Sequence, residues 1–170
     1  ARDMKESGCI GVYLGIESAS DAILKNMDKR VTRADFLNGI KHLKKYGIIS
    51  MGAFVLGFPG ETEETLNENL SFLEISGVEF YTFKEFYYME NTPVHEKRQE
   101  FGLTGIGSKW KHGTMAYEDI HPMIIQMFKK IKSSVFIDAD TSLWYIAYLY
   151  DQGYSISEII ALQTEINSVV

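Results

Sequence analysis

Residues 54–62 have the sequence Phe54-Val55-Leu56-Gly57-Phe58-Pro59-Gly60-Glu61-Thr62, in which an apolar run ends abruptly in a turn. The same change occurs earlier in the chain, in Val12-Tyr13-Leu14-Gly15-Ile16-Glu17-Ser18. A helix signal follows each run, so we expect both turns at the carboxyl ends of neighbouring parallel strands. Ligands bind at that edge in α/β folds. The sequence therefore predicts a binding site there for a small charged molecule.

Strand and helix signals alternate through the first half of the chain. Apolar runs of strand length occupy residues 9–16, 48–56 and 78–86. Helix signals lie between them, with Ser20 and Thr32 as candidate N-caps and Gly47 and Gly77 as stop residues. Strands joined by helical crossovers are parallel and right-handed, as in half of a (β/α) barrel or in part of a doubly wound sheet.

The second half of the chain has a different pattern. A short helix signal at 93–101 precedes a Gly-rich loop at 102–114, and helical patterns follow at 118–135, 140–151 and 157–169. No strand signal returns, so we predict that residues 93–170 form an all-helical C-terminal extension. Two interpretations of the loop segment 110–115 stay open: a lid that contacts substrate, or an aromatic anchor that holds the tail helices against the sheet.

Composition excludes several classes of function. A net charge of −6 without a basic stripe disfavours a nucleic-acid partner. The single cysteine, Cys9, excludes an internal disulfide and any multi-cysteine metal site built from this chain alone, and it fits a reducing, cytoplasmic location. No apolar stretch approaches the roughly 20 residues that span a bilayer, so we expect no membrane association. The histidines show no metal-binding spacing, and we expect surface or capping roles for them.

The first residues have the pattern of a helix end. Residues 2–7 resemble a last helical turn, and Gly8 closes it. We infer that the chain is a fragment whose preceding part has been cut away.

Glu17 is the leading candidate for ligand contact. A carboxylate just beyond a buried strand can accept hydrogen bonds from the two hydroxyls of a ribose. The alternative is that Glu17 only complements the dipole of the next helix. The turn 57–60 allows close approach of backbone to a ligand, because glycine lacks a side chain, but it could equally be an ordinary strand-to-helix turn.

Together, these segments resemble the back half of radical S-adenosylmethionine (radical SAM) enzymes. The resemblance covers residues 7–93 and rests on four segments: Gly15-Ile16-Glu17-Ser18, Leu24 with Met27-Asp28-Lys29-Arg30, residues 54–62, and Thr92-Pro93. It is greatest for the branch whose members often carry a cobalamin-binding domain upstream. It implies an α/β fold in which residues 1–92 form a partial TIM-type (β/α) barrel of about three parallel strands.

The resemblance also implies roles for individual residues. Glu17 corresponds to the ribose-contacting acid or amide at the end of the fourth barrel strand. Lys29 corresponds to the basic residue that pairs with the methionyl carboxylate, with Arg30 as the alternative. Residues 55–57 correspond to the fifth-strand segment that packs on the adenine, and the sixth strand ends near Phe86. The cofactor-binding residues that we assign are Glu17, Ser18, Lys29, Val55, Gly57, Pro59 and Phe86; we assign no catalytic residue and no metal ligand.

One departure from the family is decisive. The family holds its [4Fe–4S] cluster on a C-x-x-x-C-x-x-C loop, and this chain has only Cys9. The resemblance therefore implies that the chain contributes the nucleoside-binding half of an S-adenosylmethionine site, is not catalytically competent alone, and depends on cluster ligands upstream. The parent is interpreted as a cobalamin-dependent methyltransferase with its cobalamin in an upstream domain. The alternative is a non-catalytic nucleotide-binding or protein-interaction module, and the small-molecule substrate is not identified.

A partial barrel leaves a sheet edge open. Unpaired strand edges favour pairing with other chains. We therefore predict self-association through this edge.

Overall fold

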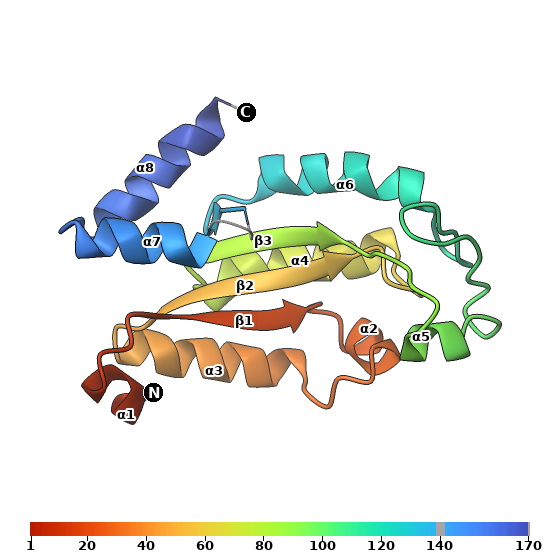
Figure 1. Cartoon of the computed structure of the whole chain (residues 1–170), viewed down its shortest axis with the longest axis horizontal. Coiled ribbons are helices and arrows are strands. Elements are labelled where there is room, and N and C mark those ends of the chain that lie inside the picture. Colours follow the sequence, from red (N-terminus) through yellow and green to blue (C-terminus); the bar gives the residue numbers. More distant parts are fainter. Residues whose placement is uncertain (139–141, 170) are drawn as a thin grey trace.

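A computed structural model of the chain describes residues 1–138 and 142–169. At its centre is a parallel sheet in the order β1-β2-β3-β4 (Figure 1). The strands are β1 (Gly11–Glu17), β2 (Ile49–Leu56), β3 (Phe80–Glu85) and β4 (Val135–Phe136). The parallel pairing of strands that follow one another in the chain confirms the predicted α/β architecture.

Helices connect and flank these strands. They are α1 (Arg2–Glu6), α2 (Asp21–Asn26), α3 (Arg33–Lys45), α4 (Glu63–Ser76), α5 (Pro93–Glu96), α6 (Tyr117–Lys130), α7 (Ser142–Asp151) and α8 (Ile156–Ser168). Local chemistry sets the ends of the long helices. The hydroxyl of Thr32 accepts from the Asp35 backbone N–H in a capping box at the start of α3, and Gly77 ends α4 in the left-handed conformation.

Both faces of the sheet are packed. Side chains alternate along a strand, so Phe54 of β2 points to the face that α4 covers, where its ring meets Phe72 at 6.1 Å. Met51 and Phe80 belong to a second cluster that contains Ile146 of α7 and Ile159 of α8. Figure 1 shows α7 beside the amino ends of the strands. The candidate site lies at the opposite ends of the strands, which are their carboxyl ends.

The second half of the chain is helical, as predicted, but it also contains a strand that the sequence did not reveal. β4 pairs in parallel with β3, with Phe80 opposite Val135 and Tyr81 opposite Phe136. Two residues are too few to produce a strand periodicity, and Val135 is the last residue of the predicted helical pattern 118–135. The helix α6 instead ends at Lys130. The first two residues of the predicted helix 140–151 lie outside the described residues.

Among the helices of residues 1–138 and 142–169, none combines the length and the apolar character that crossing a bilayer requires.

Candidate functional site

The two turns that the sequence singled out lie on adjacent strands. β1 and β2 are parallel neighbours, and Glu17 stands opposite Phe54 after a register shift between Gly15 and Glu17. The side-chain amide of Asn26, at the end of α2, donates to the Pro59 carbonyl at 3.0 Å. The connection after β1 is therefore tied directly to the turn after β2.

Glu17 and Lys29 form an ion pair at this edge. Their side-chain atoms Oε1 and Nζ are 3.2 Å apart, with 29% and 32% of the Glu17 and Lys29 side chains exposed. The Lys29 ammonium also donates to the Gly15 carbonyl. Ion pairs at a protein surface contribute only about 0–1 kcal/mol to stability, and this pair is only partly buried. Stability alone therefore does not account for the pair, which presents one negative and one positive group to solvent side by side.

The backbone at Glu17 is strained. Its φ is 64°, in the left-handed region that a residue with a Cβ rarely adopts. Such a conformation costs on the order of 1–3 kcal/mol and concentrates at functional sites. In this conformation the Glu17 carboxylate lies 3.2 Å from the Lys29 ammonium.

Gly57 is held by hydrogen bonds on both sides of its peptide. Its N–H donates to the Glu61 carboxylate, and its carbonyl lies 3.2 Å from Nε2 of His112. With φ at 88°, a Cβ on Gly57 would sit 2.7 Å from the Trp110 ring. Glycine is therefore required here both by the backbone conformation and by the neighbouring ring.

Glu61 is completely buried beneath this turn. Burial raises the pKa of its carboxyl to about 7, against the opposing effect of the Gly57 and Phe58 N–H groups and the nearby Asn69 amide. Oε1 of Glu61 and Nδ2 of Asn69 have no hydrogen-bond partner of good geometry among the described residues. A buried, partly unsatisfied carboxyl next to a glycine turn is costly for stability, which points to a role in shaping the turn.

Asn69 links this cluster to the first turn. Its Oδ1 accepts from the Ala19 N–H at 2.6 Å and from the Ser18 hydroxyl at 3.5 Å. Ser18 itself is buried, and its hydroxyl also accepts from the Ser20 N–H. The Ser18 side chain therefore supports the turn from within, on the side away from solvent.

The loop segment 110–115 behaves as an anchor. Trp110 is 1% exposed, its indole N–H donates to the Phe86 carbonyl at 2.7 Å, and its ring stacks on His112 and meets Tyr117 of α6 edge to face. Burial lowers the pKa of His112. The contacts with Tyr117 hold α6 against the strand ends, in agreement with the anchor interpretation.

The remaining predicted residues, Val55, Pro59 and Phe86, differ in how deeply they are buried. Val55, near the end of β2, is half-buried. The Phe86 ring packs against Phe58 and Trp110 at 5.1 Å and 5.6 Å, so its aromatic face is used in the core. Pro59 is buried and contributes its carbonyl to Asn26. Glu17, Lys29 and Val55 are half-buried at the strand ends, whereas Gly57 is buried against the Trp110 ring.

The sequence interpretation missed the residues that support the turns. The sequence patterns assign no role to Glu61 or Asn69. They predict a surface or capping role for His112, which is buried in the structure. A signal existed for Asn69, since it lies among Leu66, Leu70 and Leu73 on the apolar side of α4. A polar residue in such a stripe indicates a buried hydrogen-bonding partner.

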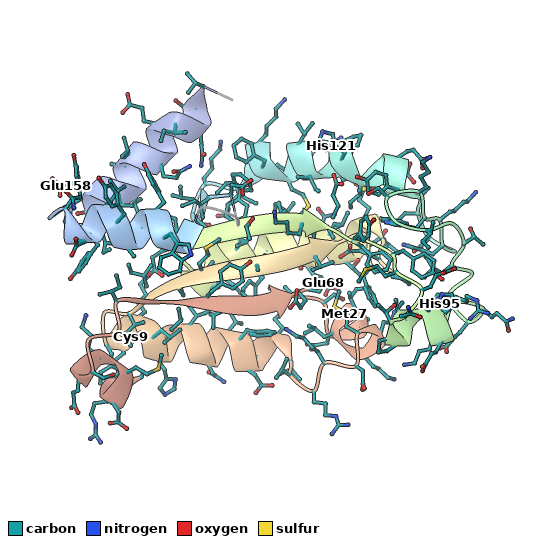
Figure 2. All side chains as sticks on the ribbon, viewed as in Figure 1. Cys9, Met27, Glu68, His95, His121 and Glu158 are labelled. Atoms are coloured by element: carbon teal, nitrogen blue, oxygen red, sulfur yellow. The ribbon has the colours of Figure 1, made fainter. Side chains whose placement is uncertain are left out.

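The donor set does not fit an iron–sulfur cluster. Cys9 precedes β1, at the opposite end of the strand from Glu17, and its thiol lies 3.4 Å from the Gly11 carbonyl. Figure 2 shows Cys9 beside α1, far from Met27 on the strand-end side. Eight extended residues separate Cys9 from Glu17, roughly 25 Å. Among the described residues, no group of three or more His, Cys, Asp and Glu side chains is placed to hold a metal ion.

Comparison with known proteins identifies relatives for the first half of the chain. Residues 1–73 match the family described as the Radical SAM superfamily. An uncharacterized methyltransferase of Pyrococcus horikoshii is 39% identical over 83 residues, which are 49% of this chain and 18% of that protein. A tRNA-2-methylthio-N(6)-dimethylallyladenosine synthase of Ehrlichia canis is 37% identical over 76 residues, which are 43% of this chain and 17% of that protein. The match therefore spans less than a fifth of these relatives.

Two solved structures share the fold. The archaeal Methanocaldococcus infernus Elp3 aligns with a TM-score of 0.51 and 20% identity, over 57% of this chain and 24% of that one. The radical S-adenosylmethionine methyltransferase TsrM of Kitasatospora setae, solved with tryptophan and a SAM analog, aligns with a TM-score of 0.51 and 20% identity, over 58% of this chain and 20% of that one. At this identity the likeness concerns the fold.

Proposed function

We propose that the carboxyl ends of β1 and β2 bind the adenosyl and methionyl parts of S-adenosylmethionine, because residues 1–73 match the Radical SAM superfamily. The Glu17 carboxylate accepts hydrogen bonds from the ribose hydroxyls. The Lys29 ammonium pairs with the methionyl carboxylate. The segment from Val55 to Gly57 lies against the adenine. The observation that carries this assignment is the partly buried Glu17–Lys29 pair, with Glu17 at a positive φ on the strand next to a glycine turn.

The buried residues around the site act by positioning. Glu61 fixes the N–H of Gly57, Asn69 fixes the backbone at Ala19, and Asn26 joins the two turns. None of these groups needs to touch the ligand. Their role is to keep the two strand ends at a constant separation, because hydrogen-bonding groups that are already in place bind without the cost of ordering them.

The cluster chemistry lies outside this sequence. We infer that the thiolates of a [4Fe–4S] cluster come from another part of the complete enzyme, since this chain has one cysteine and that cysteine is at the wrong end of β1. Bound near such a cluster, S-adenosylmethionine can take up an electron from it. The residues described here bind and orient the nucleoside. We further propose that the complete enzyme transfers a methyl or methylthio group, as the names of its relatives suggest, with cobalamin as a second cofactor.

Isothermal titration with S-adenosylmethionine and with adenosine tests the proposal. We expect Glu17→Ala to weaken both ligands by tenfold or more, because hydrogen bonds to a charged group contribute about 1.5–3 kcal/mol. Glu17→Gln keeps a hydrogen-bonding amide and should lose less. Lys29→Ala should weaken S-adenosylmethionine but not adenosine, which lacks the methionyl carboxylate.

Glu165→Gln provides the control, since Glu165 is an exposed carboxylate on α8, far along the chain from the strand ends. It should leave both affinities unchanged. Wild-type affinities that survive Glu17→Ala, in a variant with unaltered circular dichroism, would sink the assignment. A different result would support the alternative of a general nucleotide-binding module. In that case Glu17→Ala weakens adenosine binding, but Lys29→Ala leaves the affinity for S-adenosylmethionine unchanged.

A further inference from the structure

A cavity lies at the β3–β4 edge of the sheet. Its volume is about 690 Å³, and its walls come from α6, from β3 and β4, and from the C-terminal end of α8. Figure 1 shows α6 above β3, and α8 above α7, as drawn. Cavities of roughly 300–1,000 Å³ are typical of small-molecule sites. None of the strand-end site residues lines this cavity.

Its walls are mainly apolar and aromatic. Ile124 and Phe128 come from α6, and Tyr81 and Phe136 come from the adjoining strands. The rings of Tyr81 and Phe136 are 5.7 Å apart, and those of Phe128 and Phe136 are 5.6 Å apart, both edge to face. Rings locked in this way form a preformed wall. Such a surface suits a flexible hydrocarbon chain.

One polar group on this wall lacks a partner. Tyr81 as a residue is 1% exposed, and no hydrogen bond joins its hydroxyl to the described residues. The hydroxyl oxygen is not among the enclosed side-chain atoms without a partner, so it is accessible from the cavity that Tyr81 lines. Burial also raises the pKa of Tyr81, so the hydroxyl keeps its proton and remains a donor at neutral pH. An oxygen atom of a ligand would supply the missing acceptor.

The charged side chains that line the cavity have one sign, although Glu74 lies beside the rim, where its Oε1 accepts from the Lys132 backbone N–H at 3.3 Å. Lys129 and Lys132 line the cavity, both are exposed, and neither has an ion-pair partner among the described residues. No aspartate or glutamate is among the lining residues. The two ammonium groups therefore make the rim complementary to an anion.

We propose that this cavity binds a free monocarboxylate with an extended apolar tail, of the medium-chain fatty acid class. The tail lies against the aromatic and branched aliphatic wall. The carboxylate pairs with Lys129 and Lys132, and a ligand oxygen accepts from the Tyr81 hydroxyl. This site is independent of the S-adenosylmethionine site, and its ligand would affect the packing of α6 and α8 on β3 and β4.

Titration of the chain with decanoate, decanol and butyrate tests this inference. We expect saturable one-to-one binding of decanoate, weaker binding of decanol, which has no charge, and no measurable binding of butyrate, which has a short tail. Replacing both lysines, Lys129→Ala with Lys132→Ala, should lower decanoate affinity roughly tenfold and remove its advantage over decanol. Lys130→Ala is the matched control, because Lys130 neighbours Lys129 on α6 but does not line the cavity.

Tyr81→Phe tests the wall without changing its shape, and it should weaken decanoate binding without altering the circular dichroism. Unchanged decanoate affinity in both the double lysine variant and Tyr81→Phe would overturn the proposal. So would equal losses in Lys130→Ala, which would indicate general charge attraction. A dimer that excludes decanoate would overturn it too, because the cavity would then be an interface between two copies. Decanoate binding that is unaffected by Glu17→Ala supports a site separate from the nucleoside site.

Discussion

The buried carboxyl of Glu61 makes the stability of this fold depend on pH in an unusual direction. Its pKa is about 7 in the folded chain, against 4.5 for an ordinary glutamate, because burial disfavours the charged form. The folded state therefore holds its proton over a pH range in which the unfolded state has lost it. The free energy of unfolding must then fall as pH rises from 4.5 to about 7, and level off above that.

The size of the effect follows from the shift. At about 1.4 kcal/mol per pH unit, a change from 4.5 to about 7 corresponds to about 3 kcal/mol of stability lost by neutral pH. Glu61→Gln removes the titration but keeps an oxygen that accepts from the Gly57 N–H. We therefore expect the variant to gain about 3 kcal/mol relative to wild type between pH 5 and pH 8, with most of the gain below pH 7.

Urea unfolding of both proteins at several pH values measures this difference directly, since other titrating groups contribute equally to both and cancel. Glu165→Gln, at an exposed position, should show a constant offset from wild type. A Glu61→Gln profile that runs parallel to wild type would refute the reasoning. It would mean that Glu61 is charged in the folded protein and that the turn at Gly57 is stabilised by a carboxylate.

Other predictions concern the turn, its anchor and the sheet edge. Gly57→Ala should destabilise the chain by about 2 kcal/mol or more, because alanine would have to adopt a φ of 88° and its Cβ would meet the Trp110 ring at 2.7 Å. Gly39→Ala in α3, with open space around it, should stabilise the chain by about 0.8 kcal/mol in the same urea assay. Equal effects of the two substitutions would contradict this prediction. Trp110→Ala should cost about 3–5 kcal/mol, and Trp110→Phe, which loses the bond to the Phe86 carbonyl, should cost less; near-wild-type stability of Trp110→Ala would show that the anchor is dispensable. We propose that the outer edge of β1 pairs with the same edge of a second copy of the chain. Sedimentation equilibrium should then show a dimer fraction that increases with protein concentration, and a monomer at every concentration would contradict the proposal.

Local patterns were sufficient to predict the principal elements of the sheet. The strands β1, β2 and β3 were predictable because long apolar runs end in glycine or polar residues. The helices α3 and α4 were predictable because Thr32 is a candidate cap of α3 and Gly77 a stop residue of α4. β4 was missed because its pairing depends on β3, which is distant in the chain, and because two residues carry no periodicity. The first three strands and their helices could therefore be predicted from local sequence, whereas β4 depends on tertiary contacts.

The candidate site shows the same division. Glu17 and Lys29 were identified by their place in a recognisable series, and the structure brings them together. The direction of a side chain is not given by its position in the sequence, and this explains why Ser18 and Phe86 had been placed with the ligand although their side chains pack inward. The register shift after Gly15 alters the alternation of side chains at that point, and no local signal announces it.

The central claim is that the ends of β1 and β2 together form one nucleoside site. Amide resonances of the isotope-labelled chain, recorded during titration with S-adenosylmethionine, test it most directly. The account predicts shifts concentrated at Gly15, Glu17, Val55 and Gly57, and the loss of these shifts in Glu17→Ala. Shifts confined to other strands, or shifts at only one of the two turns, would contradict it.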